Sequence, residues 1–202
     1  MSAREEILSR IRSSIRERYD KPSMDDLSPI SWEDPVGQFV SALESTGGRA
    51  VELPDGACVN DIIKGLFPDA GSIASNLDGI SVATMDPDLL EDAGQMGNLD
   101  VGIVRGEIGV AENACVWVPQ TMKEKAVCFI CEHLVILLDK GSIVSNMHEA
   151  YRRINFTDYG FGTFISGPSK TADIAQVLVM GAQAARSLTV ILTGGTSLPA
   201  SC

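Results

Sequence analysis

Short apolar runs typical of β-strands alternate with helical patterns along most of this chain. The strand-like runs are Arg49–Leu53, Ser72–Ser75, Leu99–Val104, Gly162–Ser166 and Ser187–Leu192. Apolar residues recur at helical spacing between them, at 35–43, 60–67 and 147–154. Strands that alternate with helices pack into a largely parallel sheet covered by those helices. The sequence therefore predicts an α/β fold with a mostly parallel or mixed sheet and flanking helices.

The first 35 residues differ from the rest. Ile7, Leu8, Ile11 and Ile15 share helical spacing within residues 4–19, and residues 20–35 are polar and contain three prolines. We predict an N-terminal helix and an extended arm over 1–35, followed by a single α/β domain over 36–202. An amphipathic helix needs a partner surface. That surface is either its own domain, the simpler expectation, or another copy in a homo-oligomer.

The balance of charge excludes several function classes. A net charge of −11 repels phosphate backbones, so nucleic acid is not an expected partner. No apolar run reaches the length of a membrane span, and the first residues lack the apolar core of a signal peptide. We predict a soluble cytoplasmic protein that has no membrane partner. The five cysteines are then most simply free thiols.

Apolar residues 126–138 form two runs, which Glu132 and His133 separate, and both runs are predicted to be buried strands. Cys128 and Cys131 have redox or half-zinc spacing, but residues three apart in a strand face opposite sides of the sheet. We therefore expect these thiols to pack in the core. His133 and His148 are the only histidines, so a histidine-rich metal site is excluded.

Glu112 is the carboxylate with the most interesting surroundings. It lies inside an apolar run, which predicts partial burial, and burial raises the pKa of a carboxyl group. Such a residue can act as an acid, a base or a nucleophile. It can equally be a strand-end glutamate that accepts hydrogen bonds from backbone N–H groups, and the sequence leaves both interpretations open.

Residues Gly167–Ile174 read Gly-Pro-Ser-Lys-Thr-Ala-Asp-Ile and follow a strand-like run. The pattern predicts a strand-to-helix turn, with Ser169 or Thr171 as the cap and Asp173 in the first turn of a helix extending to Met180. Free N–H groups at such a turn favour an anion, and Lys170 adds a positive charge. The simpler interpretation is a capped helix with an exposed lysine, because the spacing is not that of a P-loop.

This eight-residue stretch is similar to a signature of the LUD family, the lactate-utilisation proteins. Gly109-Val110-Ala111-Glu112-Asn113 resembles the family's Gly-x-Ala-Glu-Thr motif, and the runs 130–135 and 186–192 match a strand with a histidine and the final strand. The resemblance covers roughly residues 70–195. Two departures stand out: Asn113 replaces a threonine, and Gln183 replaces a histidine in the segment after the signature.

The resemblance implies a Rossmann-like α/β sandwich of the ribose-5-phosphate isomerase, glucosamine-6-phosphate isomerase and CoA-transferase type. It also implies a part in the oxidation of L-lactate to pyruvate alongside iron–sulfur partner subunits. No cluster motif is present here, so this chain is expected to carry no cofactor of its own. The altered Gln183 segment gives weight to a binding or assembly role or to a different substrate, and whether the chain is an enzyme is left open.

Two hypotheses follow for function. In the first, the chain is an accessory or substrate-binding subunit that holds a small anionic organic acid or phosphate, with Glu112 as acid or base at the carboxyl ends of the strands. The expected ligand-binding residues are Asn113, Gly167, Ser169, Lys170, Thr171 and Asp173. In the second, the chain is a stand-alone isomerase or an acyl-CoA transferase with Glu112 as nucleophile, because residues 111–114 are similar to a Ser-Glu-Asn-Gly loop. A non-catalytic binding protein is a further alternative.

Overall fold

The computed structural model describes residues 2–17, 19–20, 22–23, 27–156, 159–174, 177–182 and 184–195. Side chains are described outside 172–174 and 177–178. Its helices are α1 (Ala3–Ser14), α2 (Pro35–Ser45), α3 (Val59–Leu66), α4 (Val127–Ile130) and α5 (Met147–Arg153), with short 3₁₀ turns η1 (Ala93–Met96) and η2 (Lys140–Ser142). Its strands are β1 (Arg49–Glu52), β2 (Ile73–Ala74), β3 (Val101–Gly106), β4 (Ile108–Val110), β5 (Cys115–Pro119), β6 (His133–Asp139), β7 (Ile143–Val144), β8 (Gly162–Ile165), β9 (Lys170–Ile174), β10 (Val177–Met180) and β11 (Ser187–Thr193).

A five-stranded sheet in the order β1-β11-β6-β3-β2 forms the centre, and all of its neighbouring strands are parallel. The predicted α/β class with a largely parallel sheet is confirmed. The central strands read as continuous apolar runs because both of their faces are buried. Alternate residues of β6 belong to different cores: Leu134, Ile136 and Leu138 face one side, and Val135 and Leu137 face the other.

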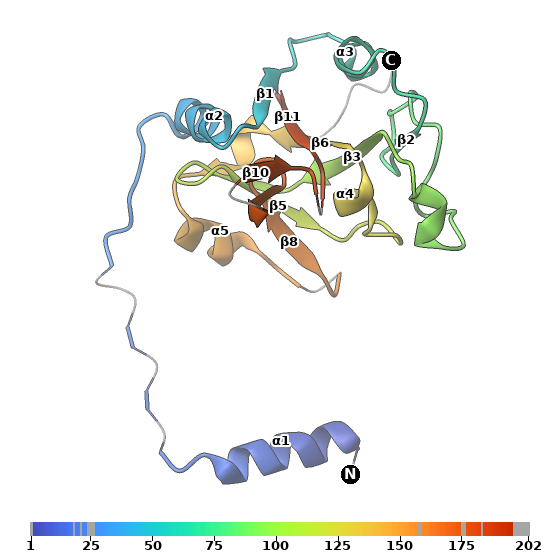
Figure 1. The fold of residues 1–202 in the computed structure, drawn as a ribbon. Helices are drawn as coiled ribbons and strands as arrows, with labels where there is room; N and C mark the ends of the chain where they lie inside the picture. Colours follow the sequence, from blue (N-terminus) through green and yellow to red (C-terminus); the bar gives the residue numbers. More distant parts are fainter. Residues whose placement is uncertain are drawn as a thin grey trace.

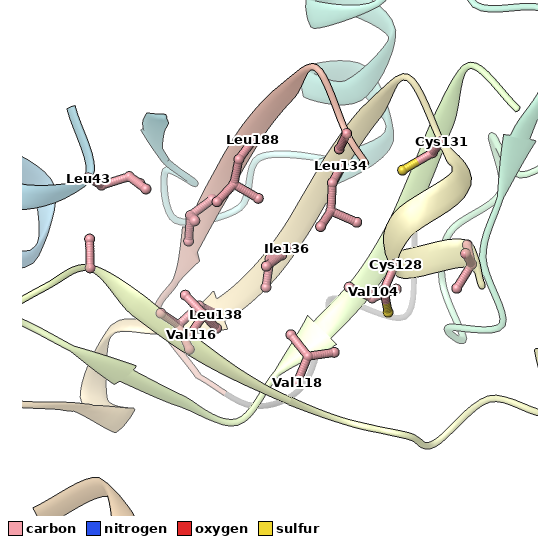
Figure 2. Packing of buried hydrophobic residues seen from close by; sticks show 14 of the residues in the cluster. Leu43, Val104, Val116, Val118, Cys128, Cys131, Leu134, Ile136, Leu138 and Leu188 are labelled. Carbon is pink, nitrogen blue, oxygen red and sulfur yellow. The ribbon is translucent and has the colours of Figure 1, made fainter. Parts of the chain in front are cut away.

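A second, mixed sheet in the order β7-β4-β5-β8 packs on the first face, together with α2 and α4. Figure 2 shows this core, in which Leu138 of β6 lies beside Val116 of β5. Glu112 and its neighbours in 111–114 form the turn between β4 and β5, as the strand-like flanks predicted.

Helix α3 covers the opposite face of the central sheet through Val59 and Ile63 (Figure 1). Cys58 holds the N-cap position of this helix without a side-chain hydrogen bond. Asn60 is buried inside the first turn. Its side chain donates to the Gly79 carbonyl at 2.9 Å and accepts from the Val82 N–H at 3.2 Å, so it anchors the loop that follows β2.

Two predicted elements are wrong. The first apolar run of 126–138 is the short helix α4 and not a strand, so the premise that Cys128 and Cys131 diverge across a strand fails, although both are buried. The helix predicted after Gly167 is an antiparallel hairpin of β9 and β10. β-Branched Val177 and Val179 suit a strand better than a helix.

The N-terminal segment stands apart from the body, which we define as residues 36–195. Figure 1 shows α1 at the end of an extended arm, and none of its residues is buried. Its amphipathic face therefore does not pack on its own domain, contrary to the simpler expectation. The arm joins the body at Trp32, whose N–H donates to the Ser145 hydroxyl at 3.2 Å. Within the described ranges, we find no helix of the length and apolarity that crossing a bilayer requires.

Candidate functional site

Residues that open the central parallel strands surround a hollow of about 480 Å³ at the amino edge of the sheet. We call it the histidine hollow, because His133 and Ser187, the first residues of β6 and β11, lie in its wall. The two residues stand opposite each other in the parallel ladder. Its lining residues are Gly47, Arg49, Leu66, Phe67, Pro68, Asp69, Ala70, Asp100, Glu132, His133, Ser187, Leu188 and Thr189.

The imidazole of His133 is held on three sides. Its Nδ1 lies 2.7 Å from the Ser187 hydroxyl, within hydrogen-bond distance. The Phe67 ring packs on the imidazole with 5.0 Å between ring centroids. Its Nε2 lies 4.0 Å from a carboxylate oxygen of Glu132, and the side chain keeps 29% of its surface exposed. A half-exposed imidazole fixed next to a hydroxyl can exchange hydrogen bonds with a polar ligand.

Asp100 closes one wall of the same hollow and is locked in place. One of its carboxylate oxygens accepts from the N–H groups of Gly71 and Ser72, both at 2.8 Å, and from the Ser72 hydroxyl at 3.0 Å. The hydrogen bonds from Ser72 and Gly71 lower the pKa of Asp100, because they favour the charged form. This carboxylate is therefore already satisfied by protein donors.

Three cationic side chains gather near this edge. Arg186 pairs with Glu132 at 2.8 Å. Arg49 lines the hollow, and the Lys170 ammonium lies 3.8 Å from the position that a Cβ atom would take at Gly47. Among the described residues, neither Arg49 nor Lys170 has a carboxylate within 4.0 Å. Asp69, Asp100 and Glu132 also line the hollow, so an anionic ligand is favoured only at the side that Arg49 and Gly47 form.

The predicted anion-binding turn lies at this same edge, but it has no helix N-terminus. The Ser169 N–H donates to the Ala185 carbonyl just before β11, and Lys170 pairs with Met180 in the hairpin. Gly167 adopts a φ of +66°, and a Cβ atom there would lie 2.7 Å from the Thr46 hydroxyl oxygen. The stretch therefore packs against the end of α2, and the backbone of Asp173 lies in β9, not in a first helical turn.

The Glu112 turn is close to this stretch, but the Glu112 side chain contacts the start of α5. Glu112 is exposed, which contradicts the predicted burial. One of its carboxylate oxygens accepts from the Met147 N–H at 2.9 Å, at the start of α5. The carbonyl of Asn113 accepts from the Ser166 hydroxyl at 2.7 Å, so the two loops meet through Asn113 and Ser166. The Gly167–Lys170 stretch lies at the amino ends of β1 and β11, so the expected shared pocket at the carboxyl ends is wrong.

A second hollow of about 880 Å³ adjoins the first, and Asp100 and Glu132 line both. We call it the wide hollow; Phe129 and Ile130 of α4 and Met180 of β10 form part of its wall. Within the described part of the chain, no group of three or more His, Cys, Asp or Glu side chains is placed to hold a metal ion.

Comparison with known proteins identifies the family. A model of the LUD domain matches residues 91–193, just over half of the chain. The chain belongs to the LUD family. The crystal structure of a DUF162 family protein from Deinococcus radiodurans matches with a TM-score of 0.62 and 13% sequence identity, over 82% of this chain and 100% of that chain. At this identity the likeness concerns the fold alone. No curated protein matches the chain.

LUD-family membership associates this chain with lactate-utilisation proteins. Of the sequence-predicted site residues, Gly167, Ser169 and Lys170 line a separate hollow of about 330 Å³, and Glu112 lies at α5. The Lys170 ammonium comes near the histidine hollow only through Gly47, which lies in the wall of that hollow. Gln183, where the family's histidine is expected, lies outside the described residues. Sequence reasoning missed Arg49 and Ser187 as site residues. Their position as first residues of parallel strands was the available signal, because such residues share one edge of a sheet.

Proposed function

We propose that this LUD protein is an accessory or substrate-binding subunit in the cytoplasmic oxidation of L-lactate to pyruvate, and that it holds a small organic acid in the histidine hollow. The observation that carries the proposal is that Arg49 and His133 line one hollow at the amino edge of the sheet, with the Lys170 ammonium beside Gly47 in the wall of that hollow. A hollow of about 480 Å³ lies within the range of small-molecule sites, roughly 300–1,000 Å³.

The chemistry of a 2-hydroxy acid fits these groups. Its carboxylate faces Arg49 and Lys170, which have no carboxylate partner among the described residues. Its hydroxyl, or the keto oxygen of the product, faces the His133–Ser187 pair, which can both donate and accept hydrogen bonds. The redox centres are proposed to lie in iron–sulfur partner subunits.

The signature stretch acts in this proposal by placing Lys170. Gly167 packs on Thr46, and Ser169 is tied to Ala185, so the backbone fixes where β9 and its lysine begin. Thr171 and Asp173 follow Lys170 in the same strand. We propose that these two residues help to position the Lys170 ammonium. The N–H group of Ser169 already donates to the Ala185 carbonyl, so it is not free for a ligand.

Calorimetric titration of the purified protein with L-lactate, pyruvate and neutral lactamide tests the proposal. We expect the two acids to bind and lactamide not to bind, because it lacks the carboxylate. Lys170→Ala removes one charge-assisted contact of about 1.5–3 kcal/mol, which weakens the affinity for the acids roughly 10- to 150-fold. We expect Arg49→Ala to weaken the affinity for the acids as well. Arg152→Ala, on the exposed face of α5, is the charge-matched control. Equal binding of lactamide, or unchanged affinity in both variants, refutes the proposal.

Glu112 supports a second candidate function, because its exposed carboxylate is accessible to a substrate. In this alternative the chain is an acyl-CoA transferase or isomerase-like enzyme of the fold group that the resemblance implies, and Glu112 and Asn113 form its site. Incubation with acyl-CoA and borohydride, followed by peptide mass analysis, would then modify Glu112 in the wild type and leave Glu112→Gln unmodified. An unmodified wild-type peptide excludes the acyl-CoA transferase.

A further inference from the structure

Helix α1 presents an apolar face that no described residue of its own chain covers. Ile7, Ile11 and Ile15 follow one another at four-residue intervals with Leu8 beside them, and all four are exposed. A capping box between Ser2 and Glu5 begins the helix. An isolated helix of 12 residues is only marginally stable in water, because its few hydrogen bonds barely offset the unfavourable free energy of nucleation. Its stability therefore depends on a surface that packs against this face.

The wide hollow is the complementary surface on the body. Phe129, Ile130 and Met180 are large apolar side chains, yet 36%, 41% and 39% of their surfaces stay exposed. All three line this one hollow, from α4 on one side and β10 on the other. A hollow of about 880 Å³ has room for several aliphatic side chains. An amphipathic helix that lays its apolar face in such a groove is a common mode of recognition.

The charges of the two surfaces are also opposite. Residues 3–16 contain four arginines and two glutamates, whereas residues 36–202 contain 19 acidic and 10 basic residues. Arg10 and Arg12 flank the apolar face of the helix, and Arg12 has no carboxylate partner among the described residues. The wall of the wide hollow contains Asp100, Glu132 and Arg186, and because Arg186 pairs with Glu132, the charged residues of this wall leave one net negative charge.

We propose that α1 of one copy docks in the wide hollow of a second copy, and that the exchange of two arms produces a symmetric dimer. The arm of each chain is fixed on its own body at Ile30 and Trp32, through Asn146 and Ser145. The anchor lies next to the first residues of α2 and α5, and Figure 1 shows α1 well apart from the body, with none of its residues buried. Arm exchange between identical chains is a low-cost route to a dimer.

The proposed dimer connects assembly with the histidine hollow. Glu132 lines both hollows and pairs with Arg186, so a helix seated in the wide hollow would rest against one wall of the site. The dimer does not depend on which ligand the histidine hollow binds. Its failure and the failure of the proposed function are therefore distinguishable.

Light scattering coupled to size exclusion, over a wide range of protein concentration, measures the oligomeric state of the full chain. We expect the wild type to have twice the mass of one chain. Ile7→Asp/Ile11→Asp on the helix and Ile130→Asp in the hollow should each halve that mass. Leu27→Asp on the arm and Leu89→Asp on the body are the matched controls, because both replace exposed leucines outside the two surfaces. A single-chain mass for the wild type, or dimers in all variants, overturns the proposal.

A photoreactive amino acid in place of Leu8 identifies the surface that α1 contacts. We expect a cross-linked product of twice the chain mass, in which α1 is joined to the peptide containing Phe129 and Ile130. A melting temperature equal to that of the wild type shows that the body of each variant is intact. A cross-link to the same peptide within one chain, or to another region, contradicts the exchange of arms.

Discussion

Gly106 ends strand β3 and faces Val116 of β5 in the second sheet, so its substitution tests how the two sheets pack. A Cβ atom at this position would lie 2.3 Å from a methyl carbon of Val116 and 3.0 Å from a methyl carbon of Ile136. Both neighbours are completely buried. Because neither can swing into solvent, Gly106→Ala must overpack the core. We expect a loss of about 1–3 kcal/mol in the free energy of unfolding, or roughly 2–12 °C in Tm for a chain of this size.

Gly65→Ala provides the matched control, because the same methyl group is added where no atom lies within 4 Å of the new Cβ. Gly65 lies inside α3, and alanine is the better helix former by about 0.5–1 kcal/mol. We therefore expect this variant to be slightly more stable than the wild type. Thermal and urea denaturation followed by circular dichroism measure both changes. If Gly106→Ala is as stable as Gly65→Ala, the two sheets do not pack as described.

Two further predictions concern titratable groups. Burial raises the pKa of Cys128 to about 12 and that of Cys131 to about 11, so both stay protonated at neutral pH. Iodoacetamide should label them only after unfolding, and peptide mass analysis showing fast labelling of either thiol in the native protein contradicts this. Hydrogen bonds from Ser72 and Gly71 lower the pKa of Asp100 in the folded state below its ordinary value. These bonds therefore contribute their whole stabilisation at any pH above the ordinary pKa, and the contribution is lost as the pH falls through the folded-state pKa. Thermal melts at acidic pH should show that Tm depends less on pH in Asp100→Asn than in the wild type. An equal dependence of Tm on pH in the two proteins refutes the assignment.

The alternation of strand-like and helical runs predicted the class of fold, and the reason is visible in β6. Its residues 134–138 are all buried, because helix and sheet cover opposite faces, so a central parallel strand is marked by an unbroken apolar run. The same criterion failed for Val127–Ile130, which is just as apolar but forms one turn of helix in the same core. A short buried run does not reveal its period.

The site was less predictable than the fold, because it depends on register. The sequence singled out Lys170 but not His133, and only the ladder between β6 and β11 places Ser187 opposite His133. The signature suggested a helix because Ser, Thr and Asp are good caps. Pairing between β9 and β10 overrides that local preference. Glu112 lies in an apolar run at a turn, so periodicity alone suggested burial where the chain is exposed.

The most direct test of the proposed ligand site is a crystal structure of the protein grown with a saturating concentration of L-lactate. We expect electron density for the acid in the histidine hollow, with its carboxylate near Arg49 and Lys170 and its hydroxyl near His133. Density for the acid at the Glu112 turn instead, or an empty histidine hollow at a concentration that saturates binding in solution, would contradict the account.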